Sequence, residues 1–211
     1  MSELGTPKGY WVARVDVHDP EGYHPYTLAN GPVIAAHGGR FLVRAGNFKT
    51  MEGDSRARNV VVEFPSFDAA QAAYYDPAYQ AAIDLRRPYS QADLVILEGV
   101  SEDLPPLEPP GVPGYWIMRI SLRNPQGYRA HAEMVGDRVA AFGGVPVARG
   151  GRIAIVEGTA RGRNVIIRFP DVHAAVECYH SPGYQQAIPL RQAVAETDFI
   201  IISGYDGPQP G

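Results

Sequence analysis

The residues best suited to chemistry lie on one predicted helix near the N-terminus, over about residues 20–37. Tyr23, Tyr26, Asn30 and His37 are spaced 3, 4 and 7 residues apart, which places them along one stripe of a helix. An imidazole can donate or accept a proton near neutral pH. The pattern therefore predicts His37 and Tyr26 as catalytic residues, with Tyr23 and Asn30 contacting the substrate.

The same stripe has a purely structural interpretation. His37 can simply hydrogen-bond a carbonyl at the helix C-terminus, where its positive charge also suits the helix dipole. Tyrosines at helical spacing are often part of a core. Pro32 removes the backbone hydrogen bond to the carbonyl of Leu28, so we expect a kink or break there and at Pro25.

Charged residues on the predicted strands form a second group of candidates. In residues 10–17 the apolar side chains alternate with Arg14, and side chains of a strand alternate between the two faces of its sheet. By this rule Arg14, Arg44 and Glu63 point into the space between two sheets, and Arg14 or Arg44 would hold an anionic group of the substrate. Since buried charges need partners, we expect Glu63 to pair with Arg168. The alternative is that these charges lie at exposed strand ends.

These residues belong to a unit that occurs twice. EGDSRARNVVVEFP at residues 52–65 returns as EGTARGRNVIIRFP at residues 157–170. A charged, glycine-containing turn that leads into a β-branched run is typical of a hairpin turn feeding a strand. The proline-rich residues 105–113 form a stiff spacer. We therefore predict a first repeat over residues 1–104, a linker over 105–113 and a second repeat over 114–211.

Each repeat shows the element order β-α-β-β-α-β. In the first repeat the strands are expected at about 10–17, 40–47, 59–64 and 93–98, and the helices at 20–37, 67–75 and 77–86. This is the order of the ferredoxin-like unit, which places its helices on one face of a four-stranded antiparallel sheet. The opposite face of the sheet must pack against another layer of the structure. The predicted fold is α+β: two ferredoxin-like repeats whose sheets pack face to face as a pseudo-dimer within one chain.

Several stretches in this order resemble a known bacterial family. GYWVARVDVHDPEGY, AAHGGRFLVRAG, YYDPAYQAAIDLR and ADLVILEG are similar to domain of unknown function 1330, in the dimeric α/β-barrel superfamily. The resemblance is close over residues 9–99 and looser over 114–204. It implies the fold and the pairing of units, but no catalytic residues, because the family has no established reaction. The superfamily includes cofactor-free monooxygenases, muconolactone-type isomerases and haem-dependent dismutases and peroxidases, and these activities are only a fold-level analogy.

Composition narrows the function classes. The net charge of −4 argues against nucleic acid and against an anionic membrane surface as partners. The apolar runs are shorter than the roughly 20 residues of a membrane helix, and the single cysteine, Cys178, gives no disulfide framework. We therefore expect a cytoplasmic protein. Nucleophile-elbow, P-loop, dinucleotide-binding and zinc motifs are absent, so no metal or cofactor is expected.

Two functions stay open. The first is a small-molecule pocket between the first helix and the sheet of repeat 1, serving isomerisation, cyclisation or cofactor-independent oxygenation. The second is a non-catalytic ligand-binding or assembly protein, with or without further homodimerisation. A cavity of about 300 Å³ would favour the first. Residues kept in both halves, such as Glu52 and Arg86, are expected to serve the scaffold through turns, caps and inter-repeat ion pairs, whereas residues that differ mark specialisation.

Overall fold

The computed structural model describes residues 5–101, 104–108 and 110–210, which form two repeats with the same order of elements. The first repeat contains β1 (Gly9–Val17), α1 (Pro20–Ala36), β2 (Arg40–Arg44), β3 (Phe48–Glu52), β4 (Arg58–Phe64), α2 (Phe67–Tyr75), α3 (Pro77–Arg86), a 3₁₀ turn (Arg87–Tyr89) and β5 (Ser90–Glu98). The second contains β6 (Gly114–Leu122), α4 (Pro125–Ala141), β7 (Val145–Ala148), β8 (Ile153–Glu157), β9 (Arg163–Phe169), α5 (Val172–His180), α6 (Pro182–Val194) and β10 (Ala195–Ser203).

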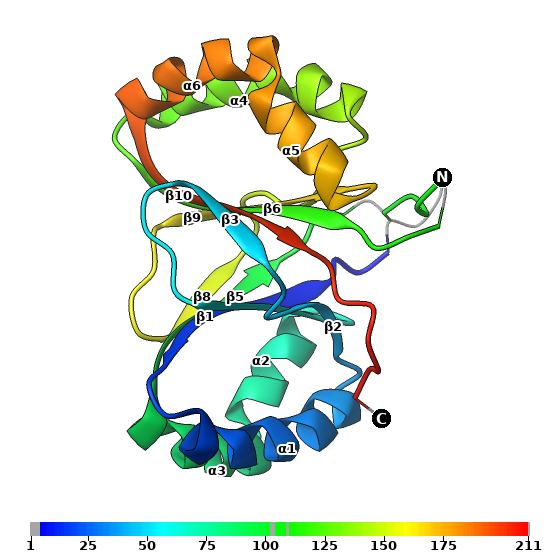
Figure 1. The fold of residues 1–211 in the computed structure, drawn as a ribbon, viewed down its shortest axis with the longest axis vertical. Coiled ribbons are helices and arrows are strands. Elements are labelled where there is room, and N and C mark those ends of the chain that lie inside the picture. The colour runs from blue at the N-terminus through cyan, green and yellow to red at the C-terminus, as the bar shows by residue number, and fades with distance from the viewer. Residues whose placement is uncertain (1–4, 102–103, 109, 211) are drawn as a thin grey trace.

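Two antiparallel sheets face each other in the middle of the molecule, and helices cover both outer faces (Figure 1). Residues from both repeats form the core between the sheets, among them Tyr10, Val12, Ile117 and Ile200. On the opposite face of β1, Trp11 packs against the helices and donates a hydrogen bond to the carbonyl of Ala70. The predicted α+β fold and the face-to-face packing of the two repeats are confirmed.

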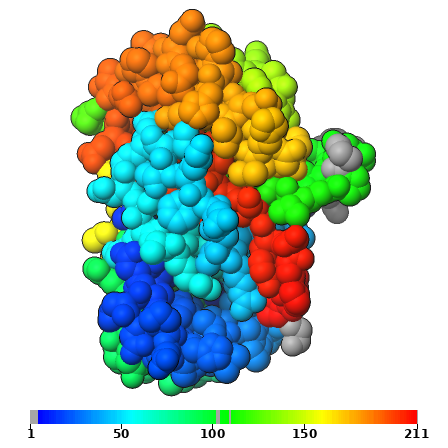
Figure 2. All heavy atoms as spheres, in the orientation of Figure 1, coloured from blue at the N-terminus to red at the C-terminus, as the bar shows by residue number. Residues whose placement is uncertain are grey.

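The sheets have five strands each, not the four expected, because the repeats exchange one strand. The strand orders are β2-β4-β1-β5-β8 and β3-β10-β6-β9-β7, so β3 joins the sheet of repeat 2 and β8 joins the sheet of repeat 1. In Figure 2 the cyan segment around β3 lies against the orange helices of the second repeat. We refer to β3 and β8 as the exchanged arms.

The repeated stretch that begins at Glu52 is therefore a crossing between sheets, and the predicted hairpin turn is wrong. Gly53 has a φ of 64° and Gly158 a φ of 61°, which favours glycine at both positions. A Cβ atom on Gly53 would also lie 2.5 Å from Oδ1 of Asp198 in the other repeat. The glycines allow the backbone to pass this close to the neighbouring repeat.

Helix α1 begins and ends as predicted, but it does not break. Asp19 caps its N-terminus by accepting hydrogen bonds from two backbone amides, and Gly38, with a φ of 70°, follows its C-terminus. The helix continues for 17 residues through Pro25 and Pro32, the same length as α4. Caps at the N-terminus and packing against the sheet outweigh the local cost of the prolines.

Candidate functional site

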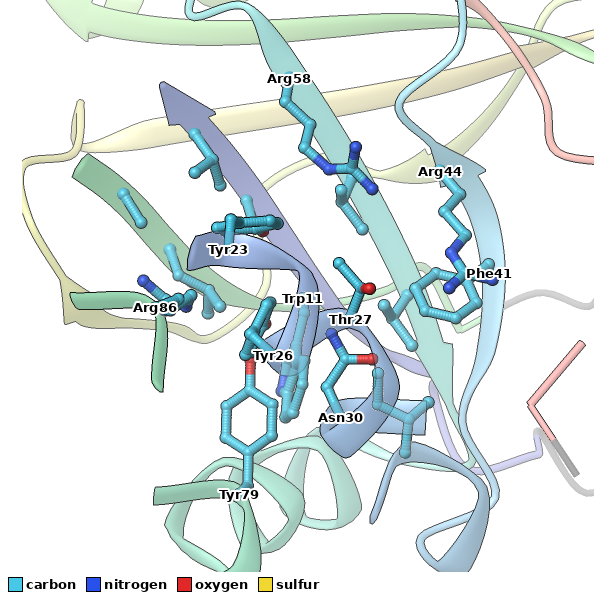
Figure 3. A pocket seen from close by; sticks show the side chains of 17 residues that line it. Trp11, Tyr23, Tyr26, Thr27, Asn30, Phe41, Arg44, Arg58, Tyr79 and Arg86 are labelled. Atoms are coloured by element: carbon cyan, nitrogen blue, oxygen red, sulfur yellow. The ribbon is translucent and has the colours of Figure 1, made fainter. Parts of the chain in front are cut away.

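A cavity lies between α1 and the first sheet, where the sequence predicted a pocket (Figure 3). Four of the predicted site residues line it: Tyr23, Tyr26, Asn30 and Arg44. Its volume is about 40 Å³, which is room for a few water molecules and far below the size of a ligand pocket. A cavity thus exists at the predicted place, but its space is too small for a substrate.

Aromatic rings fill this first cavity from both ends. At its base the hydroxyl of Tyr26 lies 3.0 Å from that of Tyr79, and Arg86 stacks over the Tyr26 ring. At its mouth Arg44 stacks over Phe41 and Tyr205, with its Cζ atom 4.6 Å and 5.6 Å from the two ring centroids. The C-terminal segment that carries Tyr205 runs along the first repeat, red in Figure 2, and therefore helps to close the mouth.

Arg44 points toward the helices and not, as expected, into the space between the sheets. The register of β2 against β4 shifts between Phe41 and Val43. Phe41 belongs to the core under the helices and Val43 to the core between the sheets. One extra residue in a strand moves every later side chain to the opposite face, so the bulge explains the wrong prediction for Arg44.

Arg14 does enter the space between the sheets, but it belongs to an ion-pair network there. Its Nε lies 2.7 Å from Oδ2 of Asp93, and its Nη1 lies 3.6 Å from Oδ2 of Asp198 in the other repeat. Burial raises the pKa of the Asp93 carboxyl, but hydrogen bonds from Arg56 and Arg14 outweigh it and hold the pKa below its usual value. With these acids beside it, Arg14 connects the two repeats.

Glu63 is buried between the sheets, yet it does not pair with Arg168, so that prediction is wrong. The carboxylate accepts hydrogen bonds from Arg40 Nε at 2.8 Å and from the hydroxyl of Tyr10 at 3.1 Å. Arg40 lies directly opposite Glu63 in the neighbouring strand. Arg168 donates instead to the carbonyl of Pro105. A partner in the adjacent strand is available to Glu63 without any contact across the sheets.

His37 lies outside the first cavity. It caps the C-terminus of α1, and its Nε2 lies 2.9 Å from Oδ2 of Asp76, the N-cap of α3. The hydrogen bond from His37 lowers the pKa of Asp76. His37 thus links two helices, and the position gives no support to its predicted catalytic role in the cavity of repeat 1.

A cavity about ten times larger occupies the equivalent place in the second repeat. It lies between α4 and the second sheet and has a volume of about 390 Å³. Three substitutions between the repeats give it this room: His131 stands where repeat 1 has Tyr26, Val135 replaces Asn30, and Pro146 replaces Phe41. We call this space the α4 cavity. Its other polar or aromatic lining residues are Trp116, Tyr128, Asp137, Arg149, Arg163, Tyr184 and Arg191.

His131 is the residue in the α4 cavity best placed for proton chemistry. Its side chain is buried, and its Nδ1 atom has no hydrogen-bond partner among the described residues. Burial, and next the nearby Arg191, lower the pKa of His131 to about 4. The imidazole is therefore neutral at physiological pH.

Two arginines that line the α4 cavity differ in how their charges are compensated. Arg191, 1% exposed, forms an ion pair with Glu52 of the exchanged arm β3. Arg163 stacks over Tyr128 with its Cζ atom 5.1 Å from the ring centroid, and among the described residues it has no carboxylate within 4.0 Å. The first repeat mirrors the Arg191 pair, since Arg86 lies 2.5 Å from Glu157 of β8. The expected inter-repeat ion pairs are confirmed.

Sequence reasoning found the smaller of the two cavities and missed the larger. It assigned the polar stripe of α1 to a ligand, whereas the larger cavity lies under α4, where Val135 and Phe142 replace Asn30 and His37. The available signal was the alignment of Tyr26 with His131 and of Phe41 with Pro146, which replaces two rings by smaller ones. Within the described residues, no group of three or more His, Cys, Asp or Glu is placed to hold a metal ion, and no helix is long and apolar enough to cross a membrane.

Comparison with known proteins agrees with the repeat and the fold. The family model described as "Domain of unknown function (DUF1330)" matches residues 8–100 and again residues 113–205. No curated protein matches the chain.

Several solved structures are similar to the chain over nearly all of its length. An anthrone oxidase-like protein has a TM-score of 0.59 at 14% identity, covering 100% of this chain and 96% of that chain. A dye-decolorizing protein from V. cholerae has a TM-score of 0.52 at 9% identity, covering 94% of each chain. A candidate monooxygenase from Lactobacillus acidophilus NCFM has a TM-score of 0.50 at 10% identity, covering 94% of this chain and 93% of that chain. At these identities the likeness shows a shared fold.

Proposed function

This chain belongs to the family of domain of unknown function 1330 and carries two copies of its domain, and from this premise we propose that it is a small-molecule-binding protein whose ligand occupies the α4 cavity. The observation that carries the proposal is the difference in volume, about 390 Å³ in repeat 2 against about 40 Å³ in repeat 1. Ligand pockets start at roughly 300 Å³. Only the α4 cavity reaches that size among the two helix–sheet cavities.

The lining of the α4 cavity also has the character of a ligand site. Such sites combine apolar walls with a few convergent polar groups. The apolar walls are made by Met118, Val135, Val139, Val165 and Ile167. His131, Arg163 and Arg191 supply the polar groups. The ligand is therefore expected to have an apolar body with polar groups at its ends.

If the protein is an enzyme, proton transfer in this cavity would fall to His131. A neutral imidazole with a free nitrogen can accept a proton from a bound substrate. Isomerisation, or an oxygenation of the kind named for the anthrone oxidase-like and monooxygenase neighbours, would begin with such a step. A binding protein without turnover would use the same cavity. Testing the first ligands found for turnover distinguishes an enzyme from a binding protein.

The proposal is tested by filling the α4 cavity with the residues of repeat 1. A panel of small acids, amides and phenols is screened by thermal shift on the wild type and on the double variant His131→Tyr, Pro146→Phe. Ligands raise the melting temperature of the wild type, because they bind the folded state alone. They are expected to leave the melting temperature of the double variant unchanged.

The matched control is His37→Phe, which introduces the residue that repeat 2 has at this position. This variant is expected to respond to ligands as the wild type does, since His37 lies outside both cavities. Ligands that stabilise the filled double variant as strongly as the wild type would refute the assignment of the site. If ligands failed to raise the melting temperature of His37→Phe alone, the ligand site would have to lie in repeat 1.

A further inference from the structure

Three residues that line the α4 cavity each carry a buried polar atom without a partner. These atoms are Nδ1 of His131, Nε of Arg163 and Nε of Arg191, each without a hydrogen bond among the described residues. His131 and Arg191 are 5% and 1% exposed. Buried polar atoms are nearly always paired in native proteins. The missing partners therefore indicate which hydrogen-bonding groups a ligand of this cavity would supply.

The two arginines require an acceptor. A guanidinium has donors only, and the charge of Arg191 is already compensated by Glu52. Arg163 donates one hydrogen bond to the backbone carbonyl of Arg149, which leaves its charge without an acid partner in the described chain. Arg149 itself is exposed and lines the same cavity. The end of the cavity near Arg163 is therefore suited to a carboxylate, which guanidinium groups bind with charge-assisted hydrogen bonds.

His131 requires a donor. A neutral imidazole has one N–H and one lone pair, and the ring is hydrogen-bonded to the backbone of Ala187. The unpartnered Nδ1 is the ring atom left to accept a hydrogen bond. A hydroxyl group, in particular a phenolic one, would satisfy it.

The smaller cavity of the first repeat also contains unpartnered polar atoms, and water is enough to satisfy them. Asn30 Oδ1, an acceptor, and Arg58 Nε, a donor, are also buried without a partner and line the same small space. A water molecule offers both a donor and an acceptor, and about 40 Å³ admits it. The α4 cavity has the same kind of polar atoms around a volume that a larger molecule must fill.

We infer that the ligand of the α4 cavity is a hydroxylated, largely apolar carboxylic acid, with its carboxylate at Arg163 and its hydroxyl at Nδ1 of His131. This inference rests on the proposed binding function and adds the chemical class of the ligand. The apolar walls fit a single aromatic ring or a branched aliphatic body between the two polar ends. Arg191, fixed by Glu52, adds a donor at the wall between them.

Matched probes separate the two contacts. Para-hydroxyphenylacetate, phenylacetate and methyl para-hydroxyphenylacetate share one ring and differ in one polar end each. Titration calorimetry on the full chain is expected to give the hydroxy acid at least a tenfold lower Kd than either of the others. His131→Phe should abolish the preference for the hydroxyl and keep the preference for acid over ester. Arg163→Gln should abolish the preference for acid over ester and keep the preference for the hydroxyl.

Arg58→Gln is the control, because Arg58 is the counterpart of Arg163 in repeat 1. It is expected to keep both preferences, with folding of all variants checked by circular dichroism. If the three probes bind equally well and Pro146→Phe blocks them, the ligand class is wrong while the binding site stands. If Pro146→Phe weakens the binding of no compound of any class, the assignment of the binding site itself is wrong. Equal effects of Arg58→Gln and Arg163→Gln would also refute the inference.

Discussion

One pair of equivalent residues accounts for much of the difference between the repeats. Tyr26 joins its hydroxyl to Tyr79 and lies under Arg86, and these contacts fill the base of the first cavity. His131 has a smaller ring, and its Nδ1 has no hydrogen-bond partner among the described residues. A duplicated chain can change one copy in this way because the other copy keeps the scaffold.

The burial of His131 predicts a specific pH dependence of stability. Its pKa is about 4 in the folded protein, against about 6.5 in the unfolded chain. Between these values the unfolded state binds more protons, so stability contributed by the neutral imidazole is present above pH 6.5 and is lost as the pH falls toward 4. From pH 7 to pH 5 the wild type should lose about 2 kcal/mol more than His131→Phe.

The measurement is urea unfolding of both proteins at the two pH values. His24→Gln serves as the control because His24 is exposed, and it should follow the wild type. Acidic residues contribute equally to all three proteins, so the difference isolates His131. Parallel pH profiles of the wild type and His131→Phe would show that this imidazole is not held neutral by burial.

At the scale of elements, each exchanged arm completes the helix–sheet layer of the other repeat. β3 carries Glu52 into repeat 2, where the carboxylate also accepts hydrogen bonds from Gln192 and, at 3.4 Å, from the hydroxyl of Tyr179. β8 carries Glu157 to Arg86 in repeat 1. Each helix–sheet layer therefore contains an arginine whose acid comes from the other repeat.

Removing one of these acids should destabilise the protein strongly. Glu52→Gln leaves Arg191 buried with an uncompensated charge, which costs about 3 kcal/mol or more. Glu157→Gln should cost a similar amount through Arg86. Chemical denaturation measures both, with Glu133→Gln on the exposed face of α4 as a control expected within about 0.5 kcal/mol of the wild type.

The two variants should differ in binding. Arg191 lines the α4 cavity and Arg86 does not, so Glu52→Gln should change the affinity for ligands while Glu157→Gln leaves it unchanged. If Glu52→Gln proves as mild as the Glu133 control, the exchanged arm is not a structural part of the site.

At the scale of the whole molecule, neither repeat covers the inner face of its own sheet or supplies all the strands of that sheet. Each sheet presents large apolar side chains to the other, including Tyr10 and Tyr115, and each borrows its fifth strand. Such a face and such an open strand edge favour association when they are exposed. The two repeats are therefore one folding unit despite the linker between them.

Separating the repeats tests this dependence. Residues 1–104 and 105–211 expressed alone are each expected to form dimers or to remain unfolded, because each lacks its cover and its borrowed strand. Mixed or expressed together, the fragments should form a one-to-one complex. Size-exclusion chromatography with light scattering gives the masses. A folded monomeric fragment would contradict the dependence.

The sequence predicted the fold well and the site only in part. Residues with local consequences were interpreted correctly: Asp19 and Gly38 at the ends of α1, and the alternation of Trp11 and Tyr10 between the two faces of β1. Residues whose predictions depended on distant partners have other neighbours in the structure. Glu63 pairs with Arg40 and not with Arg168, and His37 hydrogen-bonds Asp76 outside both cavities. Choosing among several possible partners requires distances that a pattern does not contain.

The sequence by itself determined the duplication, the order of the elements and the apolar faces that bring the two sheets together, because repeats, caps and alternation are properties of neighbouring residues. Only the tertiary structure decided that β3 and β8 change sheets, that a bulge turns Arg44 toward the helices, and that repeat 2 holds the larger cavity. These features follow from the volume left between side chains far apart in the chain. Such a volume exists only after both sheets and their helices have packed.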